Sequence, residues 1–169
     1  MSSVFKEQIV KRKPNSKDRF KRIGLVIAAL IVIIIAFSYI PWIASFLTVA
    51  AVFGAWYLMA YLKVEYEYAF TDGELDIDAI YNRSRRKRLF TARVGDIETM
   101  AHVNDKMRAG EFQGAVQTLD YSSGVVGDDT YAFLITYKGK RTKVIIEPNA
   151  VMLKAFATVL TRRKLHLKP

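Results

Sequence analysis

The chain has 169 residues and a formal net charge of +10, and its length suits one ordinary domain with an anchor. It contains no cysteine, which excludes a disulfide framework, thiolate metal sites and a cysteine nucleophile. Hydrophobic residues make up 51% of the chain and charged residues 25%. This combination is unusual for one soluble domain, so the two classes should be segregated along the sequence.

Residues 1–22 form a basic N-terminal tail that contains eight Lys and Arg residues and only two acidic residues. Within it, five residues fall on one face of a helix: Val4, Phe5, Gln8, Ile9 and Arg12. This spacing predicts a short amphipathic helix on the membrane surface. A disordered basic tail is the alternative, because the segment has few apolar residues to bury.

Residues 23–62 contain no charged residue. A hydrocarbon core of about 30 Å needs about 20 helical residues, so this stretch predicts a transmembrane helical hairpin with spans at 23–40 and 43–62. Pro41 marks the break, and Tyr39 and Trp42 at the tip suit the membrane interface. A signal peptide is a competing interpretation that the length of the apolar run disfavours.

The charge distribution predicts the orientation of the hairpin in the plasma membrane. Lys and Arg are concentrated before the first span and absent from the tip, so both termini should be cytoplasmic. In the second span, Ala50 with Gly54 and Ala51 with Ala55 are small residues four apart. This spacing favours close helix packing inside the hairpin, with self-association as the alternative.

Residues 63–169 change to the alternating pattern of a soluble β domain. Strands are predicted at 64–70, 74–81, 86–94, 97–103, 115–121, 131–137 and 142–147. Asp72-Gly73 and the segment from Lys138 to Arg141 are predicted hairpin turns. A final helix is predicted to begin at Pro148 and to carry an apolar stripe of Val151, Met152, Ala155, Phe156, Val159 and Leu160.

This order of about seven short antiparallel strands and a terminal helix resembles the pleckstrin-homology-like (PH-like) fold, an α+β arrangement in which a bent sheet forms a barrel or sandwich plugged by the helix. The segments "FKEQIVKRK", "VEYEYAFTDGELDIDAIYNRSRRKRL", "DYSSG" and "VIIEPN" extend the likeness. Together they resemble an uncharacterised family of small bacterial two-span membrane proteins with a C-terminal PH-like domain. The resemblance implies a cytoplasmic PH-like domain and no known activity.

Five basic residues lie within six positions, a segment called the basic run below: Arg83, Arg85, Arg86, Lys87 and Arg88. The first strand starts where the second span ends, extends about 25 Å at about 3.3 Å per residue, and the second strand returns a similar distance. The basic run should therefore lie near the headgroups, where it is predicted to contact anionic lipid. Two alternatives are contact with a protein partner and internal charge balance, with Arg85 or Lys87 opposite Asp76 and Asp78.

The sequence carries no motif for catalysis. There is no Gly-rich phosphate loop, no His-Glu-x-x-His and no Gly-x-Ser-x-Gly elbow, and His102 is expected to be an ordinary strand residue. The acids Glu65, Glu67, Asp76 and Asp78 lie on strands without a wrapping loop, so neither a metal nor a cofactor is expected. The positive charge is explained by topology, and no nucleic-acid partner is expected.

These features predict a membrane-anchored, non-catalytic binding module whose cytoplasmic domain contacts anionic lipid or a membrane-associated protein. The alternative is a structural subunit of a larger membrane complex, without lipid recognition. The small residues of the second span favour that alternative, whereas the basic run favours the binding module.

Overall fold

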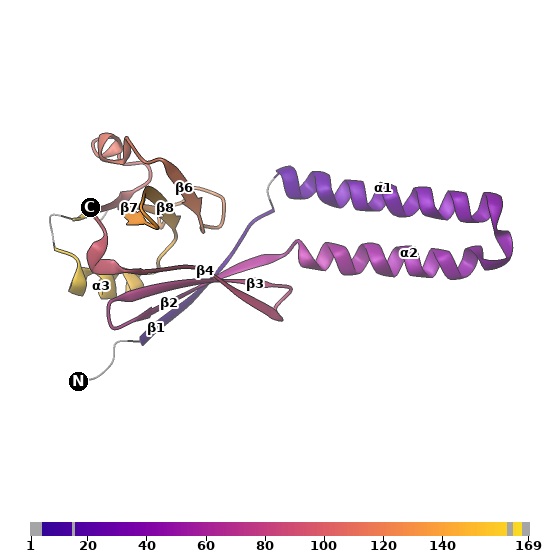
Figure 1. Ribbon diagram of the computed structural model, residues 1–169, viewed down its shortest axis with the longest axis horizontal. Helices are drawn as coiled ribbons and strands as arrows, with labels where there is room; N and C mark the ends of the chain where they lie inside the picture. Colours follow the sequence, from indigo (N-terminus) through magenta and orange to yellow (C-terminus); the bar gives the residue numbers. More distant parts are fainter. Residues whose placement is uncertain (1–4, 15, 162–163, 167–169) are drawn as a thin grey trace. The chain divides into compact units, whose positions relative to one another are not determined.

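The computed structural model describes residues 5–14, 16–161 and 164–166, and the chain forms two compact units (Figure 1). The first, the helical unit, contains helices α1 (Ser16–Tyr39) and α2 (Pro41–Tyr61) together with the short segment Tyr81–Ser84. The second, the β domain, contains the strands and helix α3 (Ala150–Val159).

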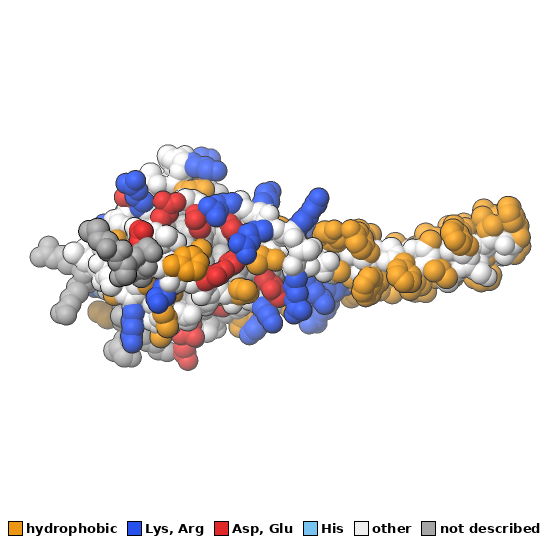
Figure 2. Space-filling model, turned by 90° about the horizontal axis from the view of Figure 1, so that it is seen from below, with side chains coloured by type: hydrophobic (Ala, Val, Ile, Leu, Met, Phe, Trp, Pro, Cys, Tyr) orange, Lys and Arg blue, Asp and Glu red, His pale blue; other side chains and the backbone are white. Residues whose placement is uncertain are grey.

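In the helical unit, α1 and α2 run side by side in opposite directions, and only Ile40 separates them (Figure 1). Both are long and apolar enough to cross a membrane, with mean hydropathies of 2.5 and 1.8. Only 6% of each apolar stretch is buried, and hydrophobic side chains cover the visible face of the hairpin (Figure 2). The two predicted helices and their break at Pro41 are confirmed, although α1 begins earlier than predicted, within the basic segment.

A four-stranded sheet of order β1-β2-β3-β4 forms one layer of the β domain. Its strands are β1 (Phe5–Lys11), β2 (Val64–Thr71), β3 (Glu74–Tyr81) and β4 (Arg85–Arg93). Between β2 and β3, Asp72 and Gly73 have φ angles of 49° and 91°, as the predicted two-residue turn requires.

Strand β1 corrects the prediction for the N-terminal tail. Residues 5–11 are neither an amphipathic helix nor disordered, and they pair antiparallel with β2 from Phe5 opposite Thr71 to Lys11 opposite Glu65. Val4 lies outside the described residues. Pairing satisfies the backbone groups of β2, which would otherwise be the edge of the sheet. The strand is stabilised by pairing with β2, a segment distant in the sequence, so the local residue pattern of 5–11 did not predict a strand.

A five-stranded sheet of order β6-β8-β7-β5-β9 forms the other layer. Its strands are β6 (Gln117–Asp120), β8 (Lys140–Ile146), β7 (Tyr131–Tyr137), β5 (Thr99–His102) and β9 (Leu165–His166). The expectation of a purely antiparallel domain is wrong, because β6 pairs parallel to β8 and β5 pairs parallel to β9. The described residues form nine strands where about seven were predicted, and β1 and β9 are the additions.

Two short 3₁₀ helices, η1 (Val94–Asp96) and η2 (Ala109–Phe112), lie between strands of the β domain. η1 follows β4 directly, so β4 ends before Val94 and β5 starts only at Thr99. The predicted strands at 86–94 and 97–103 are therefore present with shifted or shorter bounds.

Aromatic side chains fill the core of the β domain. The Phe90 ring from β4 lies 6.0 Å from the Phe133 ring of β7, and the Phe70 ring from β2 lies 5.5 Å from Phe156 of α3. All four side chains are buried. These contacts join the two sheets and place α3 against the first sheet.

Helix α3 begins two residues later than predicted. Asn149 caps it by accepting a hydrogen bond from the Met152 backbone N–H at 2.8 Å, and Pro148 precedes the cap. Met152 and Phe156 are buried, as the apolar stripe predicts, whereas Val151 is 52% exposed. The buried stripe is therefore narrower than the sequence pattern indicates.

Candidate functional site

The basic run begins in the turn between β3 and β4. Asn82 and Arg83 have φ angles of 48° and 56°, and the Ser84 N–H donates to the Tyr81 carbonyl at 3.1 Å. This geometry is that of a type I′ turn, which favours Asn at its first central position and Gly at its second. Arg83 occupies the second position at a conformational cost of about 1 kcal/mol.

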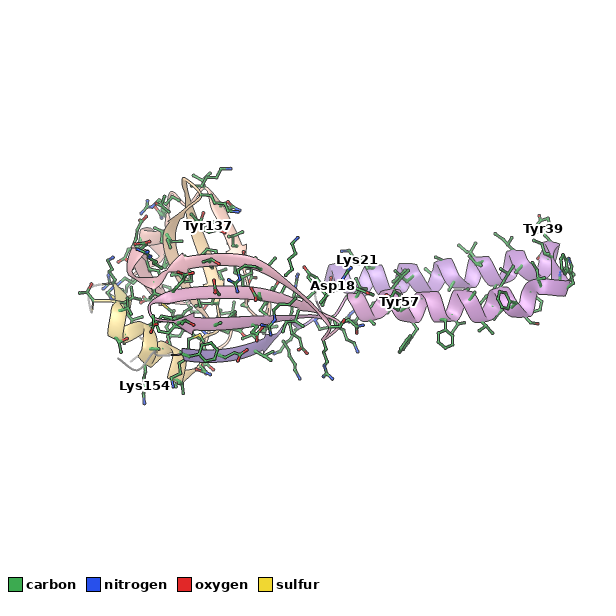
Figure 3. The ribbon with its side chains drawn as sticks, turned by 60° about the horizontal axis from the view of Figure 1, so that its bottom comes forward. Asp18, Lys21, Tyr39, Tyr57, Tyr137 and Lys154 are labelled. Carbon is green, nitrogen blue, oxygen red and sulfur yellow. The ribbon has the colours of Figure 1, made fainter. Side chains whose placement is uncertain are left out.

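The same turn belongs to the helical unit. The Asn82 N–H donates to the carbonyl of Lys63 at 3.3 Å, and Lys63 follows α2. Figure 3 shows Asp18, Lys21 and Tyr57 at this end of the hairpin, opposite the tip that carries Tyr39. The start of the basic run therefore lies at the charged end of the helical hairpin.

Two members of the basic run are paired with acids of the first sheet. Arg86 Nη2 lies 2.9 Å and 2.7 Å from the two carboxylate oxygens of Glu67. Arg88 bridges two aspartates, with Nη1 2.9 Å from Asp76 and Nε 2.8 Å from Asp78. The Glu67 and Asp78 side chains are buried, so these two arginines balance charge within the β domain.

This pairing corrects the expectation that Arg85 or Lys87 would lie across from Asp76 and Asp78. Thr91 also donates to Asp76, at 2.6 Å, although it follows Arg88 by three residues. Strict alternation would place residues 88 and 91 on opposite faces of the sheet. The alternation is therefore interrupted between Arg88 and Phe90, as in a β-bulge, and counting from the buried Phe90 selects the wrong arginines.

The remaining members of the run face solvent. The side chains of Arg83, Arg85 and Lys87 are exposed. Arg85 and Lys87 have no ion-pair partner among the residues that the structure describes. All members of the basic run are exposed, Arg86 and Arg88 included, so ion pairing divides it. Arg86 and Arg88 form a structural pair, and Arg85 and Lys87, called the exposed pair below, have no acidic partner among the described residues.

Burial dominates the electrostatics of Glu67. Desolvation and a hydrogen bond with Glu7 raise the pKa of Glu67, and the attraction of Arg86 opposes this shift only in part. Arg88 is affected differently: its hydrogen bond to Asp78 raises the pKa of the guanidinium, which stays charged. Among the described residues, no three His, Asp or Glu side chains are placed to hold a metal ion.

His102 lies in β5 and connects two backbone segments. Its Nδ1 accepts a hydrogen bond from the Asn104 N–H at 3.2 Å, so Nε2 carries the proton and donates to the Gly127 carbonyl at 3.0 Å. Both ring nitrogens are therefore used by the fold, which matches the ordinary strand residue expected.

Gln8, predicted on the face of an amphipathic helix, instead connects β1 to the start of α3. Its Nε2 donates to the Glu147 carbonyl and its Oε1 accepts from the Asn149 N–H, both at 2.7 Å. The side-chain amide thus pairs with two backbone groups as a neighbouring strand would. Gln8 is 139 residues from Glu147 in the chain, and no local pattern signals such a contact.

Two packed sheets and a C-terminal helix, joined to a pair of long apolar helices, define this protein as a PH-like domain with a helical hairpin. The chain belongs to the bacterial PH-like domain family (DUF6106), whose model matches residues 2–166. The match covers nearly the whole chain and confirms the resemblance expected from the sequence. No curated protein and no solved structure matches the chain.

Proposed function

We propose that the protein is a membrane-anchored, non-catalytic binding module whose PH-like domain contacts anionic lipid headgroups or a membrane-associated protein at the cytoplasmic face. The observation that carries this proposal is the division of the basic run. All four side chains are exposed, but Arg86 and Arg88 are paired with acids of the sheet, whereas Arg85 and Lys87 have no ion-pair partner among the described residues.

The helical unit is suited to anchor the domain in a membrane. At about 1.5 Å per residue, α1 and α2 are each long enough to cross a hydrocarbon core of about 30 Å. Their large hydrophobic side chains are exposed along both helices, among them Ile34 at 64% and Phe53 at 66%. Such a surface is costly in water and stable in lipid.

The β1–β2 ladder supports an orientation with both termini cytoplasmic. Lys11 is paired with Glu65, so the chain leaves the β domain and returns to it at one end of the same ladder. Two spans inserted at this point return the chain to the side from which it left. The concentration of Lys and Arg before α1 favours the cytoplasm as that side of the plasma membrane.

Chain connectivity supports contact between the exposed pair and the headgroups. Ser84 belongs to the helical unit, and Arg85 and Lys87 follow it by one and three residues. Since each residue extends at most about 3.6 Å, both cations lie within about 11 Å of Ser84 along the chain. A basic residue beside an anionic leaflet contributes about 1 kcal/mol, and the tether supplies a high effective concentration.

Two charge-matched double variants of the full chain test the proposal. Amides of β4, an edge strand, are followed by hydrogen exchange in nanodiscs with and without phosphatidylglycerol. In the parent chain, phosphatidylglycerol should increase the protection of residues 85–88 from exchange. Arg85→Gln/Lys87→Gln should abolish this increase without lowering the melting temperature. Arg86→Gln/Arg88→Gln should lower the melting temperature. Protection that is unchanged by anionic lipid in the parent chain contradicts lipid contact and favours a protein partner.

The second candidate function is that of a structural subunit in a larger membrane complex. One feature of the helical unit, a groove along both helices, favours it. An open apolar groove of about 300 Å³ follows both helices and is lined by small residues, among them Ala28, Ala29, Ala50, Ala51, Gly54 and Ala55. Ala51 and Ala55 are half-buried, whereas Ala50 and Gly54 are exposed. Apart from its chain neighbours and the backbone of its own helix, no atom lies within 4 Å of a Cβ built on Gly54. The expected packing of Ala50 and Gly54 inside the hairpin is therefore absent.

Small exposed residues allow another transmembrane helix to approach closely. Gly54→Leu fills the groove without touching the basic run. If the protein is an assembly subunit, this variant should lower the recovery of a cross-linked complex from membranes, whereas Arg85→Gln/Lys87→Gln should leave that recovery unchanged.

A further inference from the structure

The helical unit contains a pocket at the end where α1 begins and α2 finishes. Its volume is about 350 Å³. Arg22 of α1, Lys63 after α2 and Asn82 of the β3–β4 turn supply its polar wall, and Trp56, Tyr57 and Met59 of α2 supply most of its apolar wall. We call it the Arg22–Lys63 pocket.

Both cations of the pocket lack a counter-ion. Neither Arg22 nor Lys63 has an ion-pair partner among the described residues, and no acid lines the pocket. The Nε atom of Arg22 is buried and has no hydrogen-bond partner. Because a buried N–H without an acceptor is costly, a ligand that brings oxygen acceptors and negative charge would satisfy this N–H and balance both cations.

The chemistry of the walls indicates a lipid phosphate. Arginine donates two parallel hydrogen bonds to a phosphate, lysine adds a point charge, and the Asn82 amide donates to phosphate or glycerol oxygens. Trp and Tyr are the residues enriched at membrane interfaces, where one side is apolar and the other polar. A free inorganic anion has no apolar part that could contact this wall, whereas the acyl chains of a lipid are apolar and suited to pack against it.

We propose that the Arg22–Lys63 pocket binds the phosphate of an anionic glycerophospholipid in the leaflet that surrounds this end of the hairpin. This inference rests on the proposed function only in placing the hairpin in a membrane. It is independent of the exposed pair Arg85 and Lys87, which lie outside the pocket. The bound lipid would fix the depth of the hairpin.

The chain provides its own probe for this site. It has two tryptophans, Trp42 near the tip and Trp56 in the pocket, so Trp42→Phe leaves Trp56 as a single reporter. The full chain is reconstituted in phosphatidylcholine bilayers that contain brominated phosphatidylglycerol or brominated phosphatidylcholine. Quenching of Trp56 should show a preference for phosphatidylglycerol on the order of tenfold, as two cations beside an anionic lipid predict.

Matched variants distinguish a built site from general surface charge. Arg22→Gln/Lys63→Gln should bring the lipid preference close to one. Arg19→Gln/Lys21→Gln removes the same charge at the same end from residues that do not line the pocket, and it should retain the preference. Equal losses in the two double variants would overturn the pocket assignment, as would an unchanged preference in the first.

Asn82→Gly is a milder variant that keeps the fold of the turn. Glycine tolerates the positive φ of residue 82, so only the amide is lost. The preference should fall about threefold, as expected for one hydrogen bond. A retained preference in this variant and in Arg22→Gln/Lys63→Gln would exclude the proposed polar wall.

Two further arms separate the possible causes of failure. Inorganic phosphate at constant ionic strength should leave the quenching unchanged, and if it removes the preference, the ligand is a free phosphate and the lipid assignment is wrong. Trp56 that neither brominated lipid quenches would overturn the membrane placement, and the pocket assignment with it. Equal quenching by both lipids would overturn the pocket assignment alone. If phosphatidylglycerol adds no hydrogen-exchange protection to β4 while Trp56 keeps its lipid preference, the proposed function fails and the pocket assignment stands.

Discussion

The guanidinium of Arg86 lies 2.7 Å from the carboxylate of Glu67, which is only 3% exposed. The neighbouring Arg85 is exposed and has no such partner among the described residues. Two adjacent arginines therefore have different roles, and substitution of each should affect a different property of the protein.

Arg86→Ala should destabilise the β domain. It leaves the buried carboxylate of Glu67 without its cation, and because the Arg86 side chain is 60% exposed, the expected loss is only about 1 kcal/mol. Arg85→Ala removes the same charge and should change the free energy of unfolding by less than about 0.5 kcal/mol. Urea unfolding of the two variants measures the difference, and equal losses would show that the ion pair has no structural role.

The raised pKa of Glu67 predicts a pH dependence with a definite sign. Above the ordinary value of 4.5, the folded chain keeps a proton on Glu67 that the unfolded chain releases. The contribution of this group to stability is therefore complete below pH 4.5 and is lost as the pH rises through the folded pKa. Glu67→Gln should remove this decline. A pH profile of unfolding for Glu67→Gln that runs parallel to that of the parent would contradict the assignment.

Glu111 should show the opposite dependence. A hydrogen bond from Thr99 at 2.6 Å and a second from Arg108 lower the pKa of Glu111 below 4.5. Its contribution to stability is present above pH 4.5 and is lost as the pH falls through the folded pKa. The stabilities of Glu111→Gln and the parent should therefore converge as the pH falls below 4.5, which urea unfolding measures. A difference that stays constant over this range would count against the assignment.

The strands that the sequence predicted well are those whose side chains alternate between the core and solvent. Tyr68 and Ile77 are buried in β2 and β3, and the Asp72-Gly73 turn between these strands has the backbone that its residues favour. β1 has no comparable pattern, since Phe5 and Ile9 are exposed and its stability comes from pairing with β2. Local periodicity does not report such a contact.

The sequence shows where the basic run lies in the chain, but not which of its arginines pair with acids. The density of positive charge from Arg83 to Arg88 is visible in the sequence, whereas the interrupted alternation before Phe90 decides which arginines meet the acids. Arg22, Lys63 and Asn82 are far apart in the chain, and only the helical hairpin and the β3–β4 turn bring them into one pocket. No spacing rule links them.

The β1–β2 ladder predicts that the helical hairpin can be removed as a unit. Because Lys11 pairs with Glu65, residues 12–64 occupy the place of a hairpin loop. Replacing them with Asn-Gly should give a soluble, cooperatively folded β domain. Residues 63–169 alone lack β1 and should unfold less cooperatively. Thermal melts of both fragments test this prediction, and equal stability would show that β1 contributes little.

Gln8→Ala should destabilise the β domain more than Lys6→Ala does. It removes two hydrogen bonds, to Glu147 and Asn149, and the expected loss is about 2 kcal/mol. Lys6 is exposed on the same strand and serves as the control, with an expected change below about 0.5 kcal/mol. Urea unfolding of the soluble β domain gives both values, and similar losses would contradict the role of Gln8.

Contact between the exposed pair, Arg85 and Lys87, and anionic lipid can be followed with a probe placed beside these residues. The chain has no cysteine, so Ser84→Cys places a single environment-sensitive fluorophore between Arg83 and Arg85 in the full-length protein. Gln117→Cys, an exposed residue of β6, is the control position. In nanodiscs, phosphatidylglycerol should shift the emission of the first probe to the blue at low salt, and Arg85→Gln/Lys87→Gln should abolish the shift. An emission that is the same in anionic and zwitterionic nanodiscs would show that Arg85 and Lys87 do not contact anionic lipid.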